Sequence, residues 1–365
     1  HEGLKPAAAL MGGLLFELFP KITAHFAAGH ITLIYAVFWS PWLLWSLRKQ
    51  TDRPRFGINN FLPGVILGII FLADPRWVVY ASILWAGYNL VLVLRNMRYS
   101  RYEKEERRTD TFKRWGMSIG IQPLIAVGIA APLLLPLNQF TSLSTRIVMT
   151  AADRMVFSMP PARLLGIIFP NPTEYVEWVI YPGLFVVGAL VMSAVSPGVR
   201  KKCWGWLLLI LGSLVFALGA EIPGMNAILN LPGLNLLRVP PRILFLTGLS
   251  MAVVSAYFID VFLGENLEND LEIKIDPIFF LTGMLAFILF AAGVILSFVG
   301  RLEVNYLWGA IGFSIIYLWI LARRRKWISS TVWLVGVFLF VMFDLDGINI
   351  QSFISRSRTE VVDEG

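Results

Sequence analysis

Arg238 and Arg242 lie on either side of the dipeptide Pro240-Pro241, directly before an apolar run at residues 243–263. Guanidinium groups are planar, keep their charge and suit bidentate contacts with phosphate oxygens. Ionisable groups at the end of a membrane helix are costly to remove from water, so they are typical of functional sites. The pair therefore predicts a site for a phosphate-bearing anion.

A second group of ionisable side chains, Lys21, His25 and His30, lies near the N-terminus. Lys21 and His25 are four residues apart and would share one face of a helix. A histidine there suits a general base or a phosphate contact, and Lys21 would add positive charge beside the phosphate. The alternative is that both histidines cap or bridge helix ends. With no carboxylate nearby in the sequence and Cys203 the only cysteine, we predict no metal site.

Two carboxylates next to apolar runs, Asp74 and Glu221, are further candidates for a catalytic base. Pro75 follows Asp74 and forces a turn, so the simplest interpretation is a helix N-cap with Arg76 as its charged neighbour. In the functional alternative, Asp74 is a base or metal ligand and Arg76 binds phosphate. Glu221 would either act as a base or neutralise an arginine, because charges within membranes tend to pair.

The segment 138–177 carries three arginines, Arg146, Arg154 and Arg163. Its stretch 160–170 begins with two prolines and ends with a third, which predicts a short amphipathic helix at the membrane interface. We expect this segment to guide a lipid-linked substrate. The alternative is a plug that only faces lipid.

The composition requires a membrane to hold these residues. The chain is 57% hydrophobic and 15% charged, with a mean hydropathy of +0.68, whereas soluble domains carry about a quarter charged residues. The net charge of +7 comes from lysines and arginines in short segments between apolar runs. That pattern reflects membrane topology and does not support nucleic-acid binding.

The pattern predicts an all-α, polytopic transmembrane bundle over residues 1–343. Nine apolar runs are long enough to cross a bilayer, at residues 31–47, 77–94, 115–137, 178–195, 203–219, 243–263, 278–299, 306–322 and 327–343. Two shorter runs, 7–19 and 61–73, predict short or broken helices. Long loops at 138–177 and 220–242, and a tail at 344–365, are expected on the external face.

Sidedness follows from the basic residues. If the loop 48–56 is cytoplasmic and the spans alternate, lysines and arginines concentrate in the cytoplasmic loops, as the positive-inside rule requires. The basic segments 95–114 and 323–326 are then topology anchors. The chain starts at His1 without a signal-peptide n-region, so we expect its natural N-terminus to lie upstream.

Several short segments carry a family resemblance. They are GGLLF at 12–16, KITAHFAAGH at 21–30, WSPW at 39–42, PLLLP at 132–136, Glu177 with Tyr181-Pro182-Gly183, and LRVPPR at 237–242. Together they resemble the bacterial YfhO-type membrane proteins of the GT-C glycosyltransferase superfamily. The resemblance implies a GT-C-like bundle in the bacterial cytoplasmic membrane with its active face external.

The resemblance also implies an activity: transfer of a sugar from a polyprenyl-phosphate donor to a lipid or cell-envelope acceptor. Such enzymes place a catalytic carboxylate in their first external loop, which we expect upstream of this chain, and many continue into a soluble C-terminal portion. Lys21, Arg76, Arg238 and Arg242 would bind the donor phosphate. No cofactor is certain, although a divalent cation is compatible with such folds. Expected partners are the two substrates, membrane lipids and other membrane proteins.

Two other functions stay open at this point. A transporter of lipid-linked sugars would share the arginines, but it should show internal symmetry and a polar path through the membrane, and neither is evident. A non-catalytic membrane subunit of a larger complex would need no catalytic carboxylate.

Overall fold

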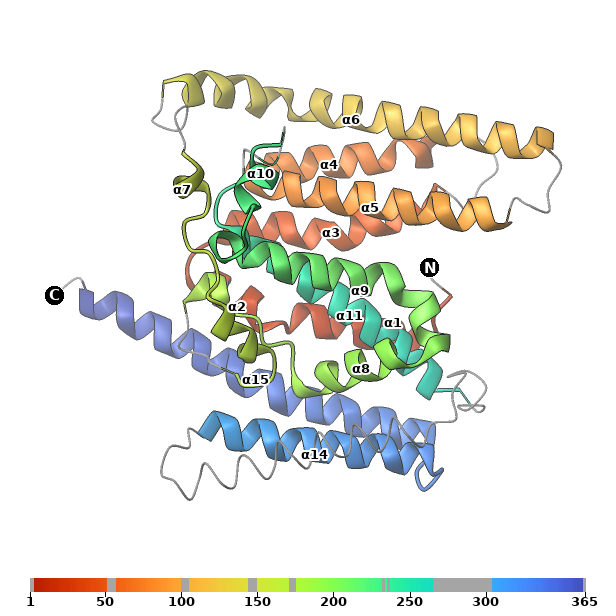
Figure 1. The fold of residues 1–365 in the computed structure, drawn as a ribbon, viewed down its shortest axis with the longest axis vertical. Coiled ribbons are helices and arrows are strands. Elements are labelled where there is room, and N and C mark those ends of the chain that lie inside the picture. Colours follow the sequence, from red (N-terminus) through yellow and green to blue (C-terminus); the bar gives the residue numbers. More distant parts are fainter. Residues whose placement is uncertain are drawn as a thin grey trace. The chain divides into compact units, whose positions relative to one another are not determined.

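The computed structural model describes residues 3–50, 57–99, 105–143, 150–170, 175–231, 234, 237–264 and 304–363. All regular structure in these ranges is helical, which confirms the all-α prediction (Figure 1). The chain divides into two compact units. The first comprises His30–Phe157 and Ile222–Pro240, and the second comprises Glu2–Gly29, Ser158–Glu221 and Pro241–Gly365.

The first unit is built around a short central helix. Its elements are α3 (Ile31–Lys49), η1 (Ile58–Asn60), α4 (Leu62–Ala73), α5 (Pro75–Tyr99), α6 (Glu105–Ser142), α7 (Ala151–Arg154) and α10 (Met225–Leu229). Helix α4 packs against α3, α5 and α6. Gly64 permits the approach to α6, because a Cβ there would lie 2.9 Å from the Cα of Gln122.

The second unit is built around α11 (Leu244–Phe262), in which most side chains are buried. The other helices are α1 (Pro6–Glu17), α2 (Pro20–Ala27), α8 (Leu184–Val195), α9 (Pro197–Ala217), α14 (Val304–Arg324) and α15 (Ser330–Asp363). Helices α1, α8 and α9 pack against α11. Helices α14 and α15 pack against α8, and α2 packs against α15 (Figure 1).

Contacts along α11 fix the direction of its neighbours. A Cβ on Gly12 of α1 would meet Ala256, whereas a Cβ on Gly248 would meet the ring of Phe19, so α1 and α11 are antiparallel. Ser213, near the end of α9, lies 2.7 Å from Thr247, oxygen to oxygen, near the start of α11. The C-terminal ends of α1 and α9 therefore adjoin the N-terminal end of α11.

Five segments of the described residues are long and apolar enough to cross a membrane: Pro6–Ala27, Pro75–Leu94, Trp115–Ser142, Pro240–Phe262 and Ser330–Ile350. The pair α8 and α9 bends by 112° at its break, and it would make a sixth candidate only if it is counted as one broken span. These helices indicate a multi-pass membrane protein. Nine complete spans are not confirmed, and the predicted run 278–299 lies outside the described residues.

The differences from the predicted spans have local causes. The predicted span 178–195 is helical only from Leu184, and Pro197 starts a new helix at a sharp angle. The two short runs form short helices, as predicted: α1 stops at Glu17 before α2 begins at Pro20, and α4 has 12 residues. Helices α1 and α2 together nevertheless make up one candidate span.

Two other segments differ from the sequence interpretation, and one basic residue makes a contact that the sequence did not predict. The stretch predicted as an amphipathic helix forms a 3-10 helix, η4 (Pro161–Ile167). The boundary predicted after residue 343 lies inside α15, which continues to Asp363. Arg323, whose role as a topology anchor stays a prediction, is 8% exposed and also caps α11, with Nε 3.1 Å from the carbonyl oxygen of Phe262 and Nη2 2.8 Å from that of Gly264.

Candidate functional site

Four ionisable side chains of the second unit meet in what we call the Glu177 cluster: Lys21, His25, Glu177 and Arg242. Lys21 and His25 lie one turn apart on α2, as the spacing predicted. Glu177 is carried by the 3-10 helix η5 (Val176–Trp178), and Arg242 by the 3-10 helix η8 (Pro240–Ile243). The cluster thus joins the end of the candidate span Pro6–Ala27 to the start of Pro240–Phe262.

Glu177 lies at the centre of this cluster. Its Oε1 accepts a hydrogen bond from Arg242 Nε at 3.0 Å, and its Oε2 lies 3.5 Å from His25 Nε2. The side chains of Glu177 and His25 are 2% and 0% exposed, whereas that of Arg242 is 13% exposed. A buried carboxylate needs such partners, because losing one leaves an uncompensated charge. Arg242 is the member of this trio that reaches the surface.

Lys21 is held by oxygen atoms of the backbone. Its fully buried ammonium donates to the carbonyl of Glu177 at 2.6 Å and lies 3.4 Å from that of Val176. It also lies 5.3 Å from the centre of the Phe245 ring. Carbonyl dipoles and an aromatic face stabilise a cation without cancelling its charge. The cluster therefore contains two basic side chains, Lys21 and Arg242, one imidazole and one carboxylate.

Apolar packing fixes the two segments that carry the cluster. Ala24 of α2 forms a buried contact group with Val176 and Val179 at η5. The imidazole of His25 lies 4.9 Å from the ring of Phe245, centroid to centroid, with the planes at 59°. The side chains of Lys21 and His25 are thus ordered against the first turn of α11.

A set of aromatic and basic side chains adjoins Glu177. The guanidinium of Arg163 on η4 lies over the indole of Trp178 at 5.6 Å, and the rings of Tyr175 and Trp178 are edge to face at 5.3 Å. Burial raises the pKa of the Tyr175 phenol, and the charge of Glu177 raises it further while Arg242 opposes the rise. Tyr175 therefore shares the electrostatic field of the cluster.

The predicted residues fall into distinct groups. Lys21, His25 and Arg242 come together in the Glu177 cluster. Arg163 contacts Trp178, the residue that follows Glu177 in the chain. Arg238 belongs to the first unit, where it is exposed. The hydrogen bonds from Thr150 lower the pKa of Asp153 most, and the positive charge of Arg238 lowers it further.

The other predicted residues belong to other elements. His30 precedes α3 and belongs to the first unit, Glu221 is exposed at the end of the 3-10 helix η6 (Gly219–Glu221), and Arg146 lies outside the described residues. Arg154 donates to the Leu229 carbonyl at 3.3 Å and to the Asn230 side chain at 2.7 Å, which ties α7 to α10. The predicted catalytic and phosphate-binding roles stay predictions.

Asp74 and Arg76 form the helix cap that the sequence indicated. Asp74 Oδ1 accepts the backbone N–H of Arg76 at 2.9 Å, and Arg76 Nε donates to both carboxylate oxygens. Thr32 donates to Oδ2 at 3.2 Å. Burial by itself would raise the pKa of Asp74, but the hydrogen bonds and charge of Arg76 hold the pKa below its ordinary value.

Sequence reasoning named Glu177 as part of the family resemblance but gave it no role in the candidate site. Its signal was a single carboxylate directly before the apolar run that begins at Trp178, with basic residues elsewhere to pair with it. Since Glu177 is far from both His25 and Arg242 in the chain, the spacing of residues could not bring the three together. Tertiary packing of α2 and η8 around η5 does so.

Asp344 is a second buried carboxylate that the sequence did not single out. It is 3% exposed and accepts hydrogen bonds from Tyr181 Oη at 2.7 Å, the Leu184 backbone N–H at 2.8 Å and Trp308 Nε1 at 2.9 Å. Gly183 permits the turn before α8, with φ of 95°. Because these three donors are neutral and include the N-terminal N–H of α8, we interpret Asp344 as a cap that links α15, α14 and α8.

The first unit contains an uncharged counterpart, the amide network of Gln50, Asn60, Asn89 and Gln122. Gln122 donates to Gln50 Oε1 at 2.7 Å and to the Asn60 carbonyl at 2.9 Å. Gln50 donates to Asn89 at 3.1 Å, and Asn60 donates to Ser118 at 2.8 Å. The network therefore links α3, η1, α5 and α6.

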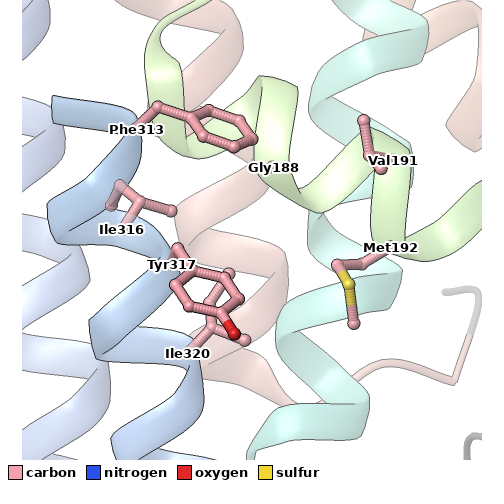
Figure 2. Close-up of a pocket in the computed structure, with 7 residues that line it drawn as sticks. All are labelled: Gly188, Val191, Met192, Phe313, Ile316, Tyr317 and Ile320. Atoms are coloured by element: carbon pink, nitrogen blue, oxygen red, sulfur yellow. The ribbon is translucent and has the colours of Figure 1, made fainter. Parts of the chain in front are cut away.

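A hollow between α8 and α14 offers no comparable chemistry. Figure 2 shows the seven residues that line it, Gly188, Val191, Met192, Phe313, Ile316, Tyr317 and Ile320. The Tyr317 hydroxyl is the polar side-chain group among them. Such a lining suits hydrocarbon and holds no acid, base or ion.

Comparison with known proteins does not identify a family. No protein-family model matches the chain, and neither curated proteins nor solved structures gave a match. The fold and the Glu177 cluster define a helical protein with several candidate membrane spans and an ionisable site at the end of two of them.

Proposed function

We propose that this protein is a membrane glycosyltransferase that moves a sugar from a polyprenyl-phosphate donor to a lipid or cell-envelope acceptor at the external face. One observation supports the proposal above all: Glu177 lies between His25 and Arg242, with Lys21 beside it, at the ends of two candidate spans. Ionisable groups in a membrane bundle are expensive to keep and are functional by default.

The arrangement would provide the two requirements of an inverting transfer, a base for the acceptor and charges that stabilise the leaving phosphate. His25 would accept the proton of the acceptor hydroxyl while the oxygen attacks the anomeric carbon, and Glu177 would stabilise the imidazolium that forms. The bond between the anomeric carbon and the phosphate oxygen breaks, and the phosphate leaves with the electron pair. Arg242 and Lys21 would stabilise that developing charge.

The distribution of charge in the second unit fits an external site. Arg323 caps the C-terminal end of α11, and the basic residues Arg200, Lys201 and Lys202 lie at the start of α9. Both positions are at the opposite end of α11 from the Glu177 cluster. Under the positive-inside rule, basic ends face the cytoplasm, so the cluster would face outward.

The test is sugar transfer by purified protein in vesicles, with a labelled polyprenyl-phosphate sugar. We expect His25→Gln to lower the transfer rate by about 100-fold or more, because a positioned base contributes a factor of that order. Arg325→Gln is the matched control, since Arg325 is exposed in the turn after α14. Unchanged transfer by a folded His25→Gln protein would exclude the proposed base.

A non-catalytic membrane subunit is the second candidate, because Glu177, Arg242 and Lys21 all have partners within the chain. A purely structural cluster would look the same. In that case the unaltered protein would transfer no sugar, and it would co-purify in fixed stoichiometry with other membrane proteins. His25→Gln would then change stability without changing an activity.

A further inference from the structure

Three segments of the second unit form a surface that we call the Trp178 patch: Arg163, Tyr175, Trp178 and Arg242. Arg163 lies over the indole of Trp178, and Tyr175 meets the same indole edge to face. Tyr175 is 39% exposed and interacts electrostatically with Arg242. The patch is therefore the partly exposed border of the buried Glu177 cluster.

Arg242 presents its terminal nitrogens to this border. Among the described residues, its recorded hydrogen bond runs from Nε to Glu177 Oε1, and 13% of the side chain is exposed. The two Nη groups thus keep donors for another acceptor. Two such groups on one guanidinium match two oxygens of a phosphate.

Stacking orients the guanidinium of Arg163. An aromatic face holds the plane of a guanidinium. Less conformational freedom is then lost when an anion binds. Among the residues that the structure describes, the patch combines two arginines, Arg163 and Arg242, with one carboxylate, Glu177.

The position of the patch favours a lipid as the source of the anion. Arg242 lies in the first turn of the candidate span Pro240–Phe262, and Trp178 lies shortly before the apolar helix α8. Tryptophan and tyrosine at the ends of apolar helices are typical of the headgroup layer. Basic residues at that depth meet the phosphates of anionic lipids.

We propose that the Trp178 patch binds the phosphate of an anionic phospholipid headgroup. The Nη groups of Arg242 contact the phosphate oxygens, the positive charge of Arg163 adds to the attraction, and the rings of Tyr175 and Trp178 cover the adjoining glycerol. This binding requires no sugar transfer, so it stands or fails independently of the proposed enzyme activity.

The experiment is a titration of purified protein in neutral detergent with short-chain phosphatidylglycerol, followed by native mass spectrometry. Phosphatidylcholine of the same chain length and inorganic phosphate form the other two arms. We expect phosphatidylglycerol to bind at least about tenfold more tightly than phosphatidylcholine, in keeping with charge-assisted contacts. Equimolar inorganic phosphate should not displace the bound lipid.

Two substitutions isolate the guanidinium contacts. Arg163→Gln removes the stacked charge, and Arg242→Lys keeps a cation beside Glu177 but loses the paired Nη donors. Each should weaken phosphatidylglycerol binding by about tenfold, while Arg325→Gln should leave it unchanged. Equal binding of the two lipids, displacement by inorganic phosphate, or normal binding by both folded patch variants would overturn the proposal.

Discussion

The two units bury polar side chains in different ways. In the amide network, both polar side-chain atoms of Gln50, Asn60, Asn89 and Gln122 take part in hydrogen bonds. The Glu177 cluster instead buries charges, and its member Arg242 keeps terminal donors at a partly exposed edge. A saturated network of neutral groups fixes helix packing, whereas a charged cluster with remaining donors can bind a ligand.

The largest expected effect comes from breaking the charged cluster on one side. Arg242→Gln would leave Glu177 buried without its guanidinium partner, so we expect the free energy of unfolding to fall by about 3–5 kcal/mol. The double variant Glu177→Gln with Arg242→Gln removes both charges and should recover most of the loss. Denaturation in mixed detergent micelles measures both. Equal stability of the single variant and the unaltered protein would show that the pair carries no buried charge.

The amide network should respond less strongly to the loss of one member. Gln122→Leu removes the partners of Trp85 Nε1, Gln50 Oε1 and the Asn60 carbonyl. Each polar group left unsatisfied costs about 1–3 kcal/mol in a protein interior and less in a membrane, so we expect a total loss of about 3 kcal/mol. The same unfolding measurement serves here.

Gln139→Leu is the matched control, because Gln139 is exposed on the same helix. It should change the free energy of unfolding by less than about 0.5 kcal/mol. If Gln122→Leu were no worse than Gln139→Leu, the saturated network would contribute nothing to helix packing, and the comparison between the two units would fail.

Asp344 lies between these two cases, since a carboxylate there meets neutral donors. Asp344→Asn keeps the shape but places an amide nitrogen among donors from Tyr181, Leu184 and Trp308. We expect a loss of about 2 kcal/mol, as for one or two unmatched buried polar groups. Ser330→Ala, at the start of the same helix, provides a reference. Full stability of Asp344→Asn would mean that the donors can rearrange around an amide.

The sequence indicated the local parts of this architecture and missed the long-range ones. Helical spacing was enough to place Lys21 and His25 on one face, and Asp74 before Pro75 was enough to predict a cap. The pairing of Glu177 with Arg242 depends on packing between distant segments, which composition does not encode. The same reason explains Arg323: its basic run predicted an anchor, but only the fold places it at the end of α11.

The smallest expected effect concerns the ion pair between the buried Asp74 and the partly exposed Arg76. Arg76 is 45% exposed, so solvent screens the pair and its contribution should be about 1 kcal/mol or less. Asp74→Asn keeps an N-cap residue and removes only the charge. The lowered pKa of Asp74 means that the stabilisation is present above the ordinary carboxyl range and disappears as the pH falls through the folded-state value.

Unfolding of the unaltered protein and of Asp74→Asn should therefore differ at pH 7 and converge in strongly acidic solution. Arg242→Gln gives the contrast, because both carboxylates are 2% exposed but Arg242 is 13% exposed, whereas Arg76 is 45% exposed. If the free energies of unfolding of the unaltered protein and of Asp74→Asn differed by the same amount at every pH, the cap, and not the charge, would carry the effect. A small, pH-dependent loss for Asp74→Asn beside a large loss for Arg242→Gln would show that the exposure of the arginine, more than the presence of an ion pair, distinguishes the two charged sites.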